Sequence, residues 1–268
     1  MAVDPMLNIN QLISQAKSEG VHHQSALPFL LEPAQFNGRS ALLVHGFSAS
    51  PEEMRILAGH LCSLGWRVLG VRLKGHGTSP QDLRHCRWQD WLQSLEDGYE
   101  VLADGSAPID LVGQSTGALL SLLLCRKRNI HRLVLLSPFI KLAHRLAEHT
   151  GWLKYFQPWQ RRQLTPEQAQ HYYADRPLAG IAQILRLRDQ LLPQLALIEN
   201  STLVIAAEGD QTTARGSAAQ LFSRLGSREK YFHLLGPEVP HVLTTGENPQ
   251  LEKTCQLIGD FLQGLHKL

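Results

Sequence analysis

The sequence predicts an α/β fold, in which a mostly parallel central sheet is flanked by helices and a helical lid is inserted late in the chain. Two observations predict it. Short apolar runs alternate with helical patterns along most of the chain, as is typical of strands that are buried on both faces of a parallel sheet. The chain has 268 residues and 43% hydrophobic content, which is enough for one domain with a sizeable core.

The first half of the chain begins with a polar stretch. Residues 1–26 are expected to form a peripheral N-terminal arm with a short helix over 9–17. A helix over 51–64 is expected to begin with Ser50 as its N-cap and with Pro51 in its first turn. The other predicted elements are strands over 40–44, 67–71, 109–112, 132–136, 203–207 and 230–235, and helices over 88–103, 116–127, 216–225 and 249–265.

The alternation of strands and helices stops after residue 137 and resumes at residue 201. We therefore predict a core over 27–137 and 201–268, and a helical insertion over 138–200. The insertion is rich in aromatic residues, which would line an apolar pocket if it forms a lid. A helical hairpin that packs its aromatic side chains on the core is the alternative. The candidate pocket residues are Trp152, Tyr155, Phe156 and Trp159.

A G-x-S-x-G motif lies between a predicted strand and a predicted helix. It reads Gly113-Gln114-Ser115-Thr116-Gly117. A strand that turns sharply into a helix strains the middle residue, and the glycines keep side chains out of the turn. The serine hydroxyl would then lie at a helix N-terminus, where negative charge is stabilised. A small-residue turn is the alternative, but this context favours a nucleophilic serine.

Candidate partners of Ser115 follow two other strands. Ligands of open parallel sheets bind at the carboxyl ends of the strands. Asp210 follows the strand over 203–207, and His241 follows the last strand, in the chain order Ser, Asp, His. His241 would accept the proton of the Ser115 hydroxyl, and Asp210 would orient the imidazole. Glu208 is the rival carboxylate, but Asp210 lies further past the strand end.

An oxyanion hole is expected at the ends of two strands. The backbone N–H groups of Phe47 and Thr116 would hold the oxyanion of the tetrahedral intermediate. His45 is expected to brace this loop, and His76 to pack in the turn Gly75-His76-Gly77. Since no ligand spacing supports a zinc site, no metal is predicted.

Composition excludes several classes of function. The net charge is +2 with 19% charged residues, and no long basic run indicates nucleic-acid binding. No segment reaches the ~18 apolar residues of a transmembrane helix, and the N-terminus lacks the layout of a secretory signal. The four cysteines are widely spaced, which favours a reduced, cytoplasmic protein. Nothing indicates the oligomeric state.

At these motifs the chain resembles the α/β-hydrolase superfamily, and within it the small carboxylesterases and monoacylglycerol-lipase-like enzymes. The similarity covers roughly residues 27 to 265. It implies an esterase that acts on small esters with an apolar acyl group, of short to medium length, or on monoglycerides, without a cofactor. The chain departs from the family pattern at Pro240, where a small residue is usual, and at 211–213, where an apolar residue is common. The matching stretches are 42–47, 74–77, 113–117, 208–210 and 241–244.

Two alternatives remain open from the sequence. A thioesterase or an amide- or peptide-cleaving enzyme would use the same residues with a different pocket. A non-catalytic ligand receptor could be built on the same scaffold, although such a receptor often lacks one of the three reactive residues, and all three candidates are present here.

Overall fold

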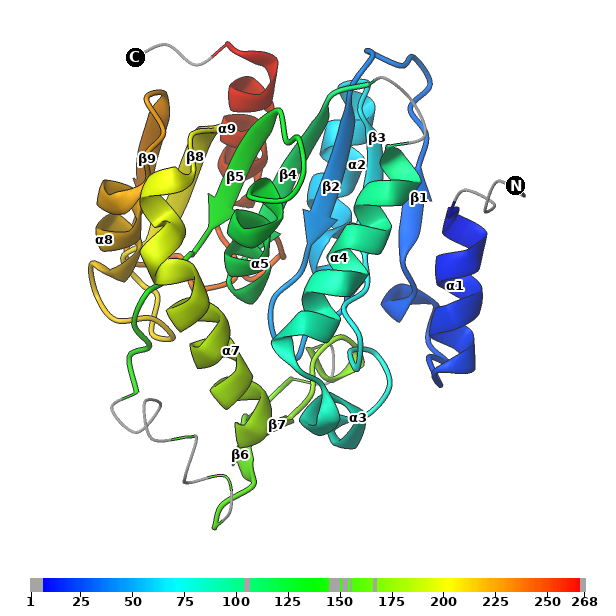
Figure 1. Cartoon of the computed structure of the whole chain (residues 1–268), viewed down its shortest axis with the longest axis vertical. Helices are drawn as coiled ribbons and strands as arrows, with labels where there is room; N and C mark the ends of the chain where they lie inside the picture. Colours follow the sequence, from blue (N-terminus) through cyan, green and yellow to red (C-terminus); the bar gives the residue numbers. More distant parts are fainter. Residues whose placement is uncertain are drawn as a thin grey trace.

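The computed structural model describes residues 7–103, 107–144, 150, 154, 156–165 and 168–265. A seven-stranded sheet lies at its centre, in the order β1-β3-β2-β4-β5-β8-β9 (Figure 1). β1 runs antiparallel to β3, and the other adjacent strands are parallel. The strands are β1 (Phe29–Leu31), β2 (Ser40–Val44), β3 (Arg67–Val71), β4 (Ile109–Gln114), β5 (Arg132–Leu136), β8 (Ser201–Ala207) and β9 (Lys230–Leu235).

The central strands are buried on both faces of the sheet. In β2, Leu42 and Val44 belong to the core on one side, and Ala41 and Leu43 to the core on the other. Because side chains alternate along a strand, a continuous apolar run supplies both cores. The prediction of a mostly parallel sheet is confirmed. The strands predicted over 40–44, 67–71, 132–136 and 230–235 have the observed bounds.

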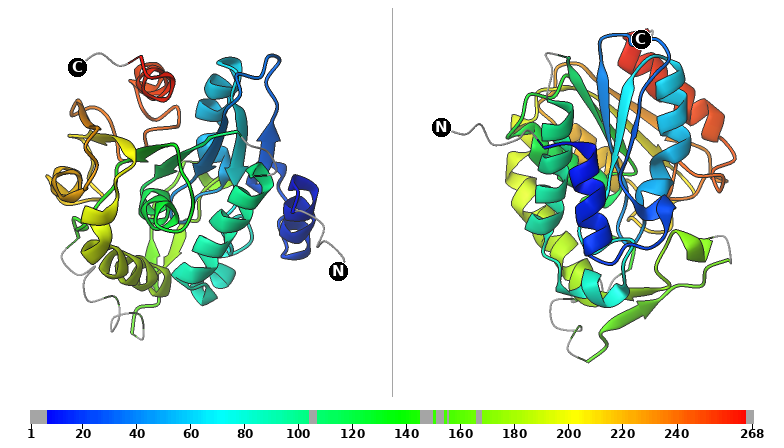
Figure 2. Two further views of the ribbon diagram at one scale, coloured as in Figure 1. Left: turned by 45° about the horizontal axis from the view of Figure 1, so that its top comes forward. Right: turned by 90° about the vertical axis from the view of Figure 1, so that its right-hand side faces the viewer.

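Helices cover both faces of this sheet (Figure 2). Helices α4, α5 and α7 lie on one face, and α2 and α9 on the other. Helix α5 is buried along nearly its whole length, because it packs against the sheet, α4 and α7. The helices are α1 (Ile9–Ser18), α2 (Arg55–Ser63), α3 (Pro80–His85), α4 (Trp88–Leu102), α5 (Thr116–Cys125), α7 (Leu178–Leu191), α8 (Ser217–Arg224) and α9 (Leu251–Gln263).

The segment between β5 and β8 differs in part from its prediction. The sequence predicts helix throughout 138–200, and α7 agrees with this. The structure adds an antiparallel pair, β6 (Trp159–Arg161) and β7 (Asp175–Pro177), close to α3 and the carboxyl ends of the central strands (Figure 1). Strands of three residues carry no periodicity that a sequence pattern can reveal. Four 3-10 turns, over Gln24–Ala26, Pro51–Met54, Gln168–Gln170 and Leu192–Leu197, complete the described elements.

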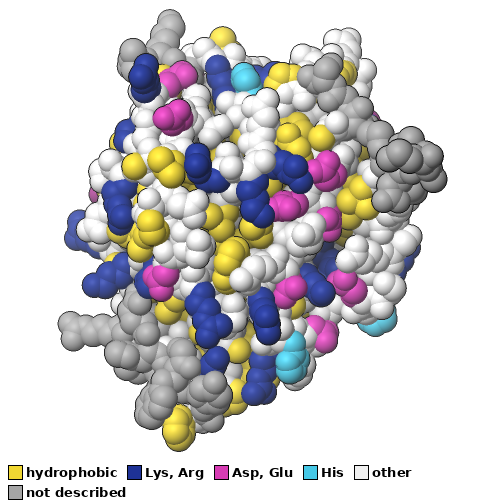
Figure 3. All heavy atoms as spheres, viewed as in Figure 1, with side chains coloured by type: hydrophobic (Ala, Val, Ile, Leu, Met, Phe, Trp, Pro, Cys, Tyr) yellow, Lys and Arg dark blue, Asp and Glu magenta, His cyan; other side chains and the backbone are white. Residues whose placement is uncertain are grey.

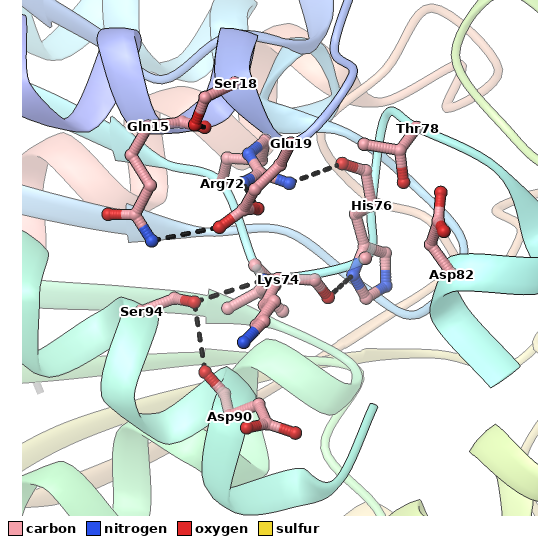
Figure 4. Close-up of polar contacts among 12 residues, drawn as sticks. Gln15, Ser18, Glu19, Arg72, Lys74, His76, Thr78, Asp82, Asp90 and Ser94 are labelled. Atoms are coloured by element: carbon pink, nitrogen blue, oxygen red, sulfur yellow. Dashed lines mark hydrogen bonds and ion pairs between the residues drawn. The ribbon is translucent and has the colours of Figure 1, made fainter. Parts of the chain in front are cut away.

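Helix α1 is attached to the loop that follows β3. Its residues Leu12 and Ala16 are buried. Glu19 forms an ion pair with Arg72, which also donates a 3.0 Å hydrogen bond to the carbonyl of His76 (Figure 4). The described part of the N-terminal segment therefore contacts the loop that carries His76.

The outer surfaces of α4 and α7 carry charges of both signs. Lys and Arg side chains are interspersed with Asp and Glu on the face seen in Figure 3. On α7, for example, Arg186 and Asp189 are both exposed. Within the described ranges, no helix combines the length and the apolar character that crossing a membrane requires.

Candidate active site

A strained turn between β4 and α5 presents Ser115. Its backbone has φ 56° and ψ −112°, a conformation that non-glycine residues rarely adopt. The flanking glycines are required for space. A Cβ on Gly113 would lie 2.5 Å from the carbonyl of Gly117, and one on Gly117 would lie 2.4 Å from the carbonyl oxygen of Val44. The turn leaves Ser115 at the N-terminus of α5, where the helix dipole favours an anion.

Ser115, His241 and Asp210 form a continuous chain of hydrogen bonds. His241 Nδ1 lies 2.7 Å from Asp210 Oδ2, and His241 Nε2 lies 2.8 Å from Ser115 Oγ. An ionised carboxylate only accepts, so Nδ1 donates to Asp210 and Nε2 accepts from the Ser115 hydroxyl. The structure thus brings together the three residues that the sequence predicts, which come from the ends of β4, β8 and β9.

Asp210 is held by more donors than the sequence indicates. Its Oδ1 accepts from the N–H groups of Thr212 and Thr213, at 2.7 and 3.1 Å, and its Oδ2 accepts from the Thr213 hydroxyl at 2.8 Å. Burial is the largest influence on the pKa of Asp210 and raises it, but the donors and the charge of His241 outweigh burial and lower that pKa. Glu208, the rival carboxylate, is exposed. Residues 211–213, where the sequence differs from the family pattern, therefore supply contacts to Asp210.

The backbone of His241 is fixed by two residues that the sequence analysis missed. Its carbonyl accepts from Gln114 Nε2 at 3.0 Å and from Ser137 Oγ at 2.7 Å. Gln114 Oε1 also accepts from the N–H of Leu243 at 3.3 Å. Gln114 stands directly before Ser115 and so ties the histidine loop to the nucleophile turn. Its position inside the G-x-S-x-G motif is the one sequence feature that could have indicated a role for Gln114.

The loop after β2 lies beside Ser115. A Cβ built on Gly46 would lie 3.5 Å from the Cβ of Ser115. The N–H groups of Phe47 and Thr116 have no hydrogen-bond acceptor among the described residues. These two groups are the donors that the sequence predicts for an oxyanion, and both belong to residues that line the cavity described below.

His45 and His76 lie beneath this loop. His45 Nδ1 donates to the carbonyl of Gly46 at 2.8 Å, and its Nε2 accepts from the N–H of Leu73 at 3.2 Å. Burial lowers the pKa of His45 to about 4, so the ring is neutral at neutral pH. The His76 ring packs edge-on against His45 and Phe47, with centroids 5.0 and 6.0 Å apart. Both histidines therefore support the loop, in agreement with their predicted places.

A buried carboxyl group, that of Glu53, was also missed. Its Oε2 accepts from the N–H of Gly46 at 2.6 Å, and its Oε1 accepts from the hydroxyl of Tyr172 at 3.0 Å. Burial is the largest influence on the pKa of Glu53 and raises it. No sequence pattern marks this contact, because Glu53 and Tyr172 are far apart in the chain.

These groups surround a cavity of about 830 Å³ that contains Ser115 and His241. Much of its wall is apolar, and the rest is polar, which is typical of a small-molecule site. The apolar lining includes Phe47, Phe139, Leu142, Leu178, Ile181, Ile184, Val239 and Val242. The polar lining includes Glu53, Gln157, Gln160, Arg162, Tyr172, Arg176, Glu238 and Glu247.

The four aromatic residues predicted for a pocket are placed as follows. Trp152 and Tyr155 lie outside the described residues. Phe156 is 72% exposed, and Trp159 is half-buried with the guanidinium of Arg84 5.8 Å from its ring. Neither of these two is among the described residues that line the cavity. The apolar lining comes largely from other residues, among them Leu178, Ile181 and Ile184 of α7.

Comparison with known proteins identifies the family. Residues 39–247 match the model of the family described as serine aminopeptidase, S33. The chain belongs to this family of α/β hydrolases. The resemblance to the α/β-hydrolase superfamily drawn from the sequence motifs is thereby confirmed.

Two relatives and one solved structure are similar over most of the chain. A thermostable monoacylglycerol lipase of Bacillus sp. (strain H-257) is 31% identical, over 70% of this chain and 77% of the lipase. A carboxylesterase of Bacillus subtilis (strain 168) is 25% identical, over 87% of this chain and 97% of the esterase. A structure from a study of LipS and LipT, two metagenome-derived lipolytic enzymes, has a TM-score of 0.80 at 19% identity, covers 90% and 98% of the two chains, and shares the fold.

Proposed function

We propose that this protein is a serine hydrolase that cleaves carboxylic esters, with Ser115 as nucleophile, His241 as general base and acid, and Asp210 as the orienting carboxylate. One observation carries the proposal: the 2.8 and 2.7 Å contacts that join the three side chains beside a cavity. The similarity to an esterase and a monoacylglycerol lipase supports ester substrates.

The geometry supports a two-step reaction. His241 Nε2 takes the proton of the Ser115 hydroxyl while Oγ attacks the ester carbonyl, and Asp210 stabilises the imidazolium that forms. The tetrahedral intermediate collapses when the imidazolium gives its proton to the leaving alcohol, which leaves an acyl group on Ser115. A water molecule then attacks the acyl group and gives a proton to His241. The imidazolium returns that proton to Ser115 Oγ as the bond between Oγ and the acyl carbon breaks, and the carboxylic acid is released.

We assign the N–H groups of Phe47 and Thr116 as the hydrogen-bond donors to the oxyanion of both tetrahedral intermediates. Both lack an acceptor among the described residues, and the loop of Phe47 lies beside Ser115. Losing one such donor typically costs ~2.7–4 kcal/mol in the transition state.

The cavity supports a small ester with an apolar acyl group, such as a short to medium acyl ester or a monoacylglycerol. Its apolar lining comes in part from α7, which belongs to the 138–200 insertion, and we assign that insertion the role of a lid. The four cysteines are all free thiols, which supports a cytoplasmic location.

Activity of purified variants tests this function. The wild type is expected to hydrolyse p-nitrophenyl esters, and Ser115→Ala to lose that activity while it keeps the wild-type circular dichroism spectrum. Asp210→Asn is expected to be strongly impaired, whereas the control Glu208→Gln, an exposed carboxylate two residues away, is expected to be active. Full activity of Ser115→Ala would refute the mechanism.

The rival hydrolase reactions are tested in the same assay. The family description names an aminopeptidase, so thioesters and amino-acid anilides of matched acyl length belong in the substrate set. A higher kcat/KM for an anilide or a thioester than for the ester would assign the chain to that reaction instead. Ligand binding without hydrolysis of any of the three would indicate a receptor.

A further inference from the structure

Two arginines at the β6–β7 pair line the cavity together: Arg176 lies in β7 and Arg162 directly follows β6. We refer to them as the arginine pair. Arg176 in β7 lies opposite Gln160 in β6, and the N–H of Arg162 donates to the carbonyl of Ala174 at 2.8 Å. Directly opposed residues, and residues two apart on one strand, share a face. Gln160, Arg162 and Arg176 therefore share one face of the β6–β7 pair, and all three line the cavity that contains Ser115.

Neither guanidinium of the arginine pair has an acidic partner. In the part of the chain that the structure describes, no carboxylate oxygen lies within 4.0 Å of either one, whereas Arg39, Arg67 and Arg72 each form an ion pair with Asp or Glu.

Neutral contacts orient both guanidinium groups. Arg176 Nε donates to the hydroxyl of Ser48 at 3.0 Å, two residues past Gly46 in the loop beside Ser115. The guanidinium of Arg162 lies 5.5 Å from the ring centre of Tyr172. Because the one hydrogen bond of Arg176 uses Nε, its two terminal nitrogens remain available to a ligand. The contacts that orient the arginine pair are thus made by uncharged groups.

The carboxylates in the cavity wall are engaged with other donors. Glu53 accepts from Gly46 and Tyr172. Glu247 accepts from Gln168 at 2.7 Å, and Glu238 accepts from Gln250. None of the three lies within ion-pair distance of Arg162 or Arg176. The charge of Glu53 acts on Arg176 from beyond that distance and raises its pKa, but burial and the charge of Arg162 outweigh this effect, so the positive charge on this side of the cavity is offset only in part.

Holding two neighbouring guanidinium groups in a partly buried site lowers the stability of the folded protein unless an anion binds to them. Burial, and then the charge of Arg162, lower the pKa of Arg176 to about 10, so Arg176 is still a cation at neutral pH. Both side chains are half-buried, and two neighbouring cations repel each other more strongly where less water screens them. A planar guanidinium presents paired N–H donors whose spacing fits the oxygens of a carboxylate or a phosphate. An oxyacid anion is therefore the ligand that this arrangement fits.

We propose that Arg162 and Arg176 bind an acidic group of the substrate, a carboxylate or a phosphate, so that the preferred esters of this enzyme are anionic. The inference rests on the proposed function of Ser115 and names its substrate class. The acidic group binds on the side of the cavity formed by β6 and β7, close to Ser48, and the apolar part of the substrate lies against α7.

Matched pairs of substrates test this preference and identify the source of the anion. The first series compares the monomethyl esters of succinate, adipate and suberate with methyl butanoate, hexanoate and octanoate. The second compares 1-acylglycerol 3-phosphate with 1-acylglycerol of the same acyl chain. We expect kcat/KM for the anionic member to exceed that for the neutral member at least about tenfold in one series. Equal or lower values for the anionic members of both series would overturn the inference.

Variants connect the preference to the arginine pair. Arg162→Gln and Arg176→Gln are each expected to lower the anionic-to-neutral ratio of kcat/KM by about 10- to 100-fold. The matched control is Arg161→Gln, an exposed arginine on the opposite face of β6, which is expected to keep the wild-type ratio. An unchanged ratio in both cavity variants would overturn the inference.

A binding measurement separates this inference from the proposed function. Titration calorimetry on Ser115→Ala with monomethyl adipate and with 1-acylglycerol 3-phosphate is expected to detect binding of at least one, and Ser115→Ala/Arg176→Gln to bind it about 10- to 100-fold more weakly. Equal binding by the two proteins would overturn the inference. Neutral esters that are hydrolysed without any anionic preference would refute the arginine-pair assignment alone, whereas absence of all ester hydrolysis would refute the proposed function.

Discussion

The hydroxyl of Tyr172 donates a 3.0 Å hydrogen bond to Glu53, whose other carboxyl oxygen accepts from the N–H of Gly46 at 2.6 Å. Tyr172 lies in the segment between β5 and β8, and Gly46 directly precedes Phe47. Burial and the neighbouring Glu53 raise the pKa of Tyr172, so its phenol stays protonated and remains a donor. One buried carboxyl group therefore joins the segment between β5 and β8 to the loop that carries a proposed oxyanion donor.

Replacing Tyr172 by Phe is expected to weaken both stability and activity. The change leaves one oxygen of Glu53 without its donor, which costs about 1–3 kcal/mol of unfolding free energy. Without this hydrogen bond, Glu53 holds the loop of Gly46 and Phe47 less firmly, so we expect kcat/KM to fall about tenfold. Chemical denaturation and ester kinetics measure the two effects. Tyr173→Phe is the control, because Tyr173 bonds to Gly75 and Thr78 and not to Glu53. An equal loss of activity in both variants would contradict this role of Glu53.

Glu53 is also expected to make the unfolding free energy depend on pH. Burial raises its pKa in the folded protein above 4.5, so the folded state holds this proton more tightly than the unfolded chain does. The resulting stabilisation is complete below pH 4.5 and is lost as the pH rises through the folded-state pKa. In Glu53→Gln the titration is absent.

Urea denaturation from pH 4 to pH 8 measures this difference. The unfolding free energy of the wild type minus that of Glu53→Gln is expected to fall as the pH rises above 4.5. The contribution of Asp210, whose pKa is lowered, has the opposite sign but is common to both proteins and cancels. A difference that rises with pH would show that the folded-state pKa of Glu53 is lowered instead.

The sheet and the nucleophile turn could be predicted because local pattern determines them. The strand over 40–44 is apolar at every position except Ser40, and the turn at Ser115 needs glycines at two fixed positions. Asp210 and His241 could be proposed because parallel strands end at one edge of the sheet. The contacts of Asp210 with Thr213, and of His241 with Gln114 and Ser137, join loops through side chains and leave no periodic signal.

The segment between β5 and β8 shows the limit of prediction from composition. Its aromatic content suggests a pocket lining, yet Phe156 is exposed and Trp159 packs near Arg84. Composition does not specify which face of a segment is buried. The short β6–β7 pair decides which side chains face the cavity, and its register places Arg162 and Arg176 there.

Gly180 is expected to be required for the position of Phe47. A Cβ at Gly180 would lie 2.4 Å from the Cζ atom of Phe47, so Gly180→Ala must displace the ring or α7. Because the N–H of Phe47 is a proposed oxyanion donor, we expect kcat to fall about tenfold. Gly59→Ala in α2, where a Cβ would have no neighbour within 4 Å, is the control. It is expected to gain about 0.5–1 kcal/mol of stability without a loss of kcat. Wild-type kcat in Gly180→Ala would exclude this coupling.

Ile181 is expected to set the acyl length that the cavity accepts. It lies on α7, is half-buried and lines the cavity. Ile181→Trp fills part of the apolar region, while each methylene of an acyl chain gains about 0.8 kcal/mol on burial. We expect the ratio of kcat/KM for p-nitrophenyl dodecanoate to that for the butanoate to fall at least about tenfold. Arg186→Ala, an exposed position on the same helix, is expected to keep the ratio. A ratio unchanged by Ile181→Trp would place the acyl chain elsewhere.

The hydroxyl of Thr213 is expected to keep Asp210 ionised and oriented. Thr213→Val keeps the shape of the side chain and removes a 2.8 Å hydrogen bond to the oxygen that His241 contacts. The folded-state pKa of Asp210 should then move up toward 3.8, and the variant should lose about 1 kcal/mol of stability at pH 7. Because a lowered carboxyl pKa stabilises the folded state only above the unfolded-state pKa, this loss should shrink as the pH falls below 3.8.

In the same variant we expect kcat/KM to fall about fivefold, since Asp210 keeps its two backbone donors. Thr212→Val, whose hydroxyl does not contact Asp210, should lose less stability at pH 7, and a loss equal to that of Thr213→Val would show that the Thr213 hydroxyl does not act through Asp210.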